Sequence, residues 1–233
     1  GTLTVKTGGC ASTTYNISIT VNKAPSITTQ PSDVTKCSGE TAVFSAAASG
    51  TPTPTIQWQV NSGSGWGNIS NATNNSYSVN ASSSNNGYQY RAVYTNTCGS
   101  VNANAATLTL GSAPTVSTQP SNTSVCPNTS ASFTASASGA NTMQWQVNSG
   151  SGWSDISGAT NNSYSFTATS GDDEKMYRIV YTNSCGTTYS NSGTLSMNTS
   201  PTMLTQPSSN SAAAGSNITF SAAANGTPTP TVQ

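Results

Sequence analysis

The sequence predicts an all-β protein made of two-sheet β-sandwich domains that follow one another in a linear row. The first observation behind this is a repeat: residues 39–58 recur as 128–145 and begin again as 215–233. The second is alternation, because apolar and polar residues take turns over short runs, as they do in half-buried strands. Turn-forming Gly, Asn and Ser residues separate these runs about every 8–12 residues, a spacing typical of sandwich domains.

The same repeat divides the chain into four segments. A Gln-Pro pair recurs at 30–31, 119–120 and 206–207, and a small residue followed by proline precedes each pair. Proline fixes φ and has no N–H to donate to a sheet, so these sites are typical of a junction where an edge strand begins. We expect two complete repeats, 24–111 and 112–199. Residues 1–23 are then a C-terminal fragment of a preceding repeat and 200–233 an N-terminal fragment of a following one.

The strands expected in repeat one are short and are joined by Gly- and Asn-rich turns. They cover residues 42–46, 56–60, 66–70, 77–79, 88–94 and 106–110. Repeat two follows the same plan from Phe133 to Tyr181. Alternation places one tryptophan and one tyrosine of each repeat inward, and these four side chains are the expected centres of the two cores: Trp58 and Tyr90 in repeat one, Trp145 and Tyr177 in repeat two.

The pattern G-x-x-x-x-F-x-A-x-A-x-G-x-P-x-P-x-I-x-W at residues 39–58 resembles strands B and C of an intermediate-set immunoglobulin domain. Residues 86–99 resemble the end of the E–F corner, strand F and the F–G turn, which places Tyr90 at the corner tyrosine. The whole chain is similar to the bacterial immunoglobulin-like tandem repeats of large secreted surface adhesins of the Bacteroidota type. The resemblance implies one immunoglobulin-like sandwich per complete repeat.

The cysteines depart from the antibody pattern, in which strands B and F each carry one. Alanine or isoleucine holds those places here, and the five cysteines are Cys10, Cys37, Cys98, Cys126 and Cys185. Their long spacings and the absence of histidine disfavour a metal site and a catalytic thiol. We therefore expect structural disulfides and an extracellular, cell-surface location.

The resemblance also implies how these cysteines pair. Cys37 precedes strand B at one pole of its domain, and Cys98 lies in the F–G turn at the other, roughly 35–40 Å away along the strands. A disulfide tolerates only about 7 Å between Cα atoms. In a head-to-tail row this favours Cys37–Cys185 across a domain junction, with Cys10, Cys98 and Cys126 paired to repeats outside this sequence. Within-repeat pairing is the alternative that a register error in either strand would restore.

A polar sheet face is the candidate ligand site. Arg91 and Arg178 alternate with the core tyrosines of strand F, so they point outward, over the glutamines of strand C. The predicted face consists of Gln57, Gln59 and Arg91 in repeat one and of Gln144, Gln146 and Arg178 in repeat two. Such a face either binds glycan or protein or is merely solvated. Trp66 and Trp153 follow Gly-rich turns and are expected to be only partly buried.

Charge excludes several classes of function. Six basic and six acidic side chains give a formal net charge of zero. The chain therefore lacks the excess of positive charge that binding to nucleic acid or to an anionic membrane requires. No apolar run approaches the roughly 18 residues of a membrane span. Catalysis needs an acid or base with a tuned pKa in a pocket, and this chain has no histidine and few acids. We expect no enzyme activity, no metal and no cofactor.

The sequence thus favours a structural stalk in a large bacterial cell-surface adhesin or surface filament that projects a binding tip. Its expected partners are neighbouring repeats of the same chain and other copies in a filament. The alternatives are accessory repeats of a secreted polysaccharide- or protein-degrading enzyme, or repeats that themselves bind glycan.

Overall fold

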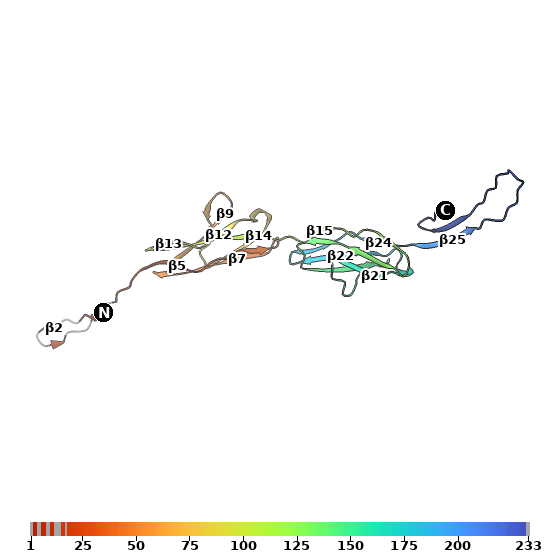
Figure 1. Cartoon of the computed structure of the whole chain (residues 1–233). Coiled ribbons are helices and arrows are strands. Elements are labelled where there is room, and N and C mark those ends of the chain that lie inside the picture. Colours follow the sequence, from red (N-terminus) through yellow and green to blue (C-terminus); the bar gives the residue numbers. More distant parts are fainter. Residues whose placement is uncertain (1, 4–5, 8–9, 12–14, 17, 232–233) are drawn as a thin grey trace. The chain divides into compact units, whose positions relative to one another are not determined.

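The computed structural model describes residues 2–3, 6–7, 10–11, 15–16 and 18–231. The chain divides into two compact units, Gly1–Gly111 and Ser112–Gln233, each of which contains one β-sandwich (Figure 1). The predicted all-β, tandem-sandwich fold is confirmed. Strands and two single 3-10 turns make up the regular structure of the described residues.

In the first unit, the larger sheet has the strand order β10-β9-β12-β14-β6, and β13 also pairs with β12. The other layer consists of β5 paired with β8 and β7 paired with β11. The strands are β5 (Lys23–Thr29), β6 (Val34–Lys36), β7 (Thr41–Ser45), β8 (Ala47–Thr51), β9 (Thr55–Asn61), β10 (Trp66–Asn68), β11 (Ser76–Asn80), β12 (Gln89–Asn96), β13 (Gly99–Asn102) and β14 (Ala106–Leu110), with the 3-10 turn η1 (Ser83–Asn85).

The second unit repeats this topology. Its larger sheet has the order β16-β24-β22-β19-β20 with β23 on β22, and the other layer pairs β15 with β18 and β17 with β21. The strands are β15 (Thr115–Thr118), β16 (Thr123–Val125), β17 (Ser130–Thr134), β18 (Ser136–Ser138), β19 (Thr142–Asn148), β20 (Trp153–Asp155), β21 (Ser163–Thr167), β22 (Met176–Asn183), β23 (Gly186–Tyr189) and β24 (Gly193–Met197), with η2 (Ser170–Asp172).

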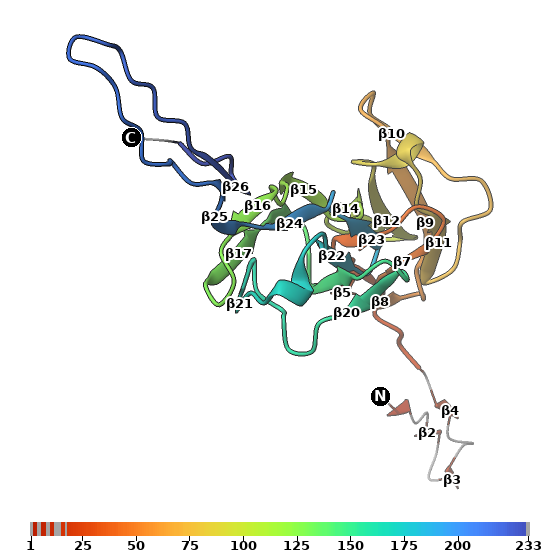
Figure 2. The same cartoon turned by 90° about the vertical axis from the view of Figure 1, so that its right-hand side faces the viewer.

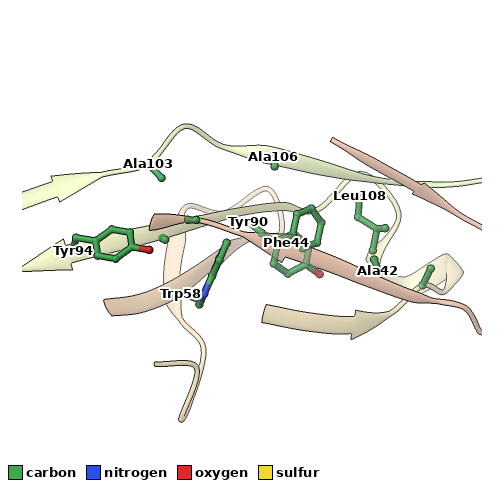
Figure 3. Packing of buried hydrophobic residues seen from close by; sticks show 11 residues of the cluster. Ala42, Phe44, Trp58, Tyr90, Tyr94, Ala103, Ala106 and Leu108 are labelled. Atoms are coloured by element: carbon green, nitrogen blue, oxygen red, sulfur yellow. The ribbon is translucent and has the colours of Figure 1, made fainter. Parts of the chain in front are cut away.

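Each core is built around its inward-facing tryptophan. Trp58 is fully buried, and its indole N–H donates a 2.8 Å hydrogen bond to the carbonyl of Asn74. Phe44 and Tyr90 stack with ring centroids 4.7 Å apart beside it (Figure 3). Trp145 is buried in the same way and donates to the carbonyl of Asn161. Alternation along the strands therefore predicted the inward residues correctly, because a strand turns successive side chains to opposite faces.

Strands β8 and β13 are additional to those that were predicted. The segment expected to end at Ala46 extends as β8 to Thr51, and the break falls at Ala46, whose N–H donates to the carbonyl of Asn75. The strand expected at 106–110 is observed as β14 with those bounds, and an additional strand, β13, precedes it. Between them the side-chain oxygen of Gln30 accepts the backbone N–H of Asn104 at 2.7 Å, and in the second unit Gln119 accepts that of Asn191 at 2.8 Å. The glutamine of the recurring Gln-Pro pair thus has a structural role: its side-chain oxygen accepts a backbone N–H at the point where the chain leaves the sheet.

The described residues of the terminal segments form short strand pairs. At the start, β1 (Thr2–Leu3) pairs with β4 (Tyr15–Asn16), and β2 (Lys6–Thr7) pairs with β3 (Cys10–Ala11). At the end, β25 (Thr199–Thr205) pairs with β26 (Ala223–Thr227), and a long loop joins them (Figure 2). Phe220 occupies the repeat position of Phe44, yet it is 63% exposed where Phe44 is 1% exposed. No residue of 200–231 is buried.

Candidate functional site

The outer face of the larger sheet carries an arginine in contact with a tryptophan in each repeat. In repeat one, Arg91 on β12 lies directly opposite Gln59 on β9, and its Nε donates a 2.9 Å hydrogen bond to Gln59 Oε1. Gln59 in turn donates to Asn68 Oδ1 at 2.9 Å. The guanidinium carbon of Arg91 lies 4.1 Å from the ring centroid of Trp66, within cation–π range. The polar row therefore crosses three strands.

Repeat two builds the same row and adds to it. Arg178 Nε donates to Gln146 Oε1 at 2.9 Å, and Gln146 Nε2 donates to Asp155 Oδ1 at 2.8 Å. The guanidinium carbon lies 4.1 Å from the ring centroid of Trp153 and 4.4 Å from that of Tyr189 on β23. We call these five residues the Arg178 face.

The matching face of repeat one differs at two of the five positions. Asn102 replaces the second ring, since it pairs with Val93 as Tyr189 pairs with Val180. Asn68 replaces the carboxylate of the Arg178 face. The sequence interpretation included both arginines, but it did not place the two tryptophans beside them. It missed Tyr189, although alternation along β23 turns this residue to the same side as its partner Val180.

Two of the predicted face residues have another role. Gln57 Nε2 donates to the carbonyls of Trp58 and Ile69 at 2.9 and 2.7 Å. Gln144 makes the equivalent bonds to Trp145 and Ile156 at 2.9 and 2.6 Å. Through these hydrogen bonds, the glutamine amides hold the segment after β10 against β9 and the segment after β20 against β19. Only Gln59 and Gln146 hydrogen-bond to the arginines.

The turns between β12 and β13 and between β22 and β23 hold equivalent cysteines. The side-chain oxygen of Asn96 accepts the backbone N–H of Cys98 at 2.9 Å, and Asn183 accepts that of Cys185 at 2.8 Å. Asparagine thus shapes both turns identically.

Cysteines at equivalent positions of the two repeats differ in whether they are free or disulfide-bonded. Cys98 and Cys126 are free and exposed, whereas Cys37 and Cys185 are disulfide-bonded. The two within-repeat pairs are therefore not formed, since each would contain one of the free thiols. The pairing of Cys37 with Cys185 stays a prediction. The side chain of Cys10 lies outside the described residues.

One ionic cluster lies at η2. Asp172 accepts a 2.8 Å hydrogen bond from the ammonium of Lys175 and a 2.8 Å bond from the backbone N–H of Thr169. These bonds, that of Lys175 foremost, lower the pKa of Asp172 to about 2. In repeat one Asn85 caps η1 in the same manner, accepting the N–H of Ser82 at 2.9 Å. The carboxylate therefore serves as a turn cap that binds a neighbouring cation.

The remaining perturbed groups are tyrosines of the cores. Burial raises the pKa of Tyr90 to about 12 and also raises the pKa of Tyr177, so neither serves as an acid or base near neutral pH. In the part of the chain that the structure describes, no three His, Cys, Asp or Glu side chains gather in a group able to hold a metal ion. The same residues include no helix long and apolar enough to cross a membrane.

Comparisons with known proteins agree with this architecture. Residues 24–96 match a family model described as an immunoglobulin domain, and residues 115–199 match one described as a domain of unknown function, DUF8696. An I-band fragment of titin superposes with a TM-score of 0.52 at 17% identity, over 79% of this chain and 69% of the fragment. A mutated titin variant of three immunoglobulin domains also gives 0.52 at 17% identity, over 88% of this chain and 77% of that one. The chain therefore contains two immunoglobulin-like β-sandwich domains in tandem.

One curated relative is similar in sequence. Endoglucanase C of Cellulomonas fimi is 40% identical over 171 residues, which are 72% of this chain and 16% of the relative. The chain thus spans about a sixth of that protein's length.

Proposed function

We propose that this chain is a segment of accessory immunoglobulin-like repeats in a secreted glycan-degrading enzyme. The observation that carries the proposal is the 40% identity to Endoglucanase C over 171 residues. An identity of this size over 171 residues implies a shared ancestor. Because only 16% of the relative is matched, the rest of that protein can contain a separate catalytic domain.

The chemistry of the described residues fits an accessory role. The ionisable groups with shifted pKa values are core tyrosines and the turn cap Asp172, and Asp172 is bound to the ammonium of Lys175. Trp58 and Trp145 are fully buried and form the centres of the two cores. The repeats are therefore suited to holding other domains or a surface in place, and the chemical step belongs to another part of the protein.

The sequence had favoured the stalk of a surface adhesin over this role. That prediction depends on the tandem repeat and the neutral surface, which accessory repeats share. The relationship to an endoglucanase favours the alternative that the sequence left open. The disulfide-bonded Cys37 and Cys185 fit export to an oxidising compartment in either case.

The full-length gene provides the test. We expect its reading frame to encode, beside these repeats, a catalytic domain with the pair of carboxylates that glycoside hydrolysis requires. The full-length protein should hydrolyse a soluble β-glucan, and deletion of residues 24–199 should leave that activity largely intact. The 233-residue chain alone should release no sugar. A reading frame with many further repeats and no catalytic domain would contradict the proposal and restore the adhesin stalk.

A further inference from the structure

Tyr189 stands apart from the other tyrosines of the sandwiches. Tyr90, Tyr94, Tyr177 and Tyr181 are all at most 3% exposed, whereas Tyr189 is 54% exposed. It lies on the outer face of the sheet, where the guanidinium of Arg178 packs against its ring at 4.4 Å. An exposed ring that is already held in place loses little conformational freedom when a ligand covers it.

The polar groups around this ring have the composition of a sugar-contacting surface. Arg178 uses its Nε to donate to Gln146, which leaves its terminal nitrogens as donors at the surface. Asp155 is exposed and accepts one bond from Gln146 through Oδ1, so its carboxylate keeps further acceptor capacity. A sugar ring offers both an apolar C–H face, which packs on an aromatic ring, and hydroxyls that donate and accept hydrogen bonds.

The charges on the Arg178 face select among ligands. Arg178 and Asp155 carry opposite charges and are linked through Gln146, so the face has no net charge of its own. An anionic polymer would bring its charge against Asp155 without a surplus of positive charge to offset it. An uncharged chain of sugars meets no such penalty.

We propose that the Arg178 face of repeat two binds an uncharged β-glucan chain, by stacking on Tyr189 and Trp153 and by hydrogen bonds to Arg178 and Asp155. The choice of glucan as the sugar polymer rests on the proposed function. Repeat one lacks the second ring and the carboxylate, with Asn102 and Asn68 in their places, and does not bind. The chain therefore has one binding face and one natural control.

The test is titration of the 233-residue chain with cellohexaose by calorimetry, together with sedimentation on amorphous cellulose. We expect one site per chain. Tyr189→Asn copies the residue of repeat one and should weaken binding of cellohexaose by at least about tenfold, as loss of a central aromatic contact does. Because Tyr189 is largely exposed, the melting temperature of this variant should stay unchanged. The control is Val43→Asn, which removes an exposed apolar side chain from β7 in the smaller layer of repeat one. This variant should bind cellohexaose as the parent chain does.

The reverse substitutions test sufficiency. Asn102→Tyr combined with Asn68→Asp rebuilds the Arg178 face on repeat one and should raise the stoichiometry from one site to two. The inference is overturned if the parent chain does not bind cellohexaose, if Tyr189→Asn binds as tightly as the parent, or if polygalacturonate binds at least as well. These outcomes are separate from those of the proposed function, because a reading frame with a catalytic domain can accompany repeats that bind no glucan.

Discussion

Replacement of Trp58 by phenylalanine tests how the cores are held. Trp58 is fully buried and its indole N–H donates to the carbonyl of Asn74 at 2.8 Å. Phenylalanine removes the second ring, which costs roughly 1–2 kcal/mol for the lost burial and the void. It also leaves that carbonyl unpaired, which costs about 1–3 kcal/mol more. The sum, ~2–5 kcal/mol, is a large part of the roughly 5–15 kcal/mol that stabilises a domain.

Scanning calorimetry of the 233-residue chain provides the measurement. A loss of 1 kcal/mol lowers the melting temperature of a domain of this size by about 4–8 °C, so the transition of repeat one should move down by at least about 8 °C. Trp145→Phe should do the same to repeat two, because its indole N–H makes the matching bond to Asn161. Trp66→Phe is the control, since Trp66 is only half-buried and phenylalanine still packs on Arg91. A shift for Trp58→Phe no larger than that for Trp66→Phe would refute this account of the core.

Three further predictions concern the turns and junctions. The bond to Lys175 lowers the pKa of Asp172 to about 2, so this contact stabilises repeat two above about pH 4 and is lost as the pH falls toward 2. Asp172→Asn should remove about 0.5–1 kcal/mol at neutral pH, the size expected for a screened surface ion pair, and should flatten that part of the stability profile, measured by urea unfolding at several pH values. Peptide mapping without reduction should recover Cys37 joined to Cys185, and a peptide joining Cys37 to any other cysteine would rule out that pairing. Gln119→Ala should cost about 1–2 kcal/mol, because a backbone N–H after β23 loses its 2.8 Å partner; a variant as stable as the parent would show that water replaces it.

Sequence reasoning predicted the parts of the fold that depend on a local period. The alternation Ala42, Phe44, Ala46 places these side chains on one side, and all three are buried. Trp58 followed from the same rule on the next strand. Such patterns work because the pleat of a strand sends every second side chain to the same face, whatever the rest of the chain does.

The parts that sequence reasoning missed depend on contacts between distant residues. Alternation showed that Gln57 and Gln59 point away from the core. It could not show that Gln57 donates to the carbonyl of Ile69 while Gln59 accepts a hydrogen bond from Arg91. Gln30 marked a junction in the sequence, yet its bond to Asn104 exists only because the last strand leaves the sheet at that point. Tyr189 reaches Arg178 only because β23 pairs with β22 in the register that places Tyr189 opposite Val180.

The parallel pairing of β6 with β14 has a mechanical consequence. Val34 lies opposite Leu108, and the two strands run in the same direction. The chain enters repeat one ahead of β6 and leaves it after β14, so tension along the chain draws these strands past each other along their lengths. Their evenly spaced hydrogen bonds are then loaded together instead of opening one after another. The matching strands β16 and β24 are also paired in parallel. In each repeat, therefore, a parallel strand pair loaded in shear resists unfolding by a pulling force.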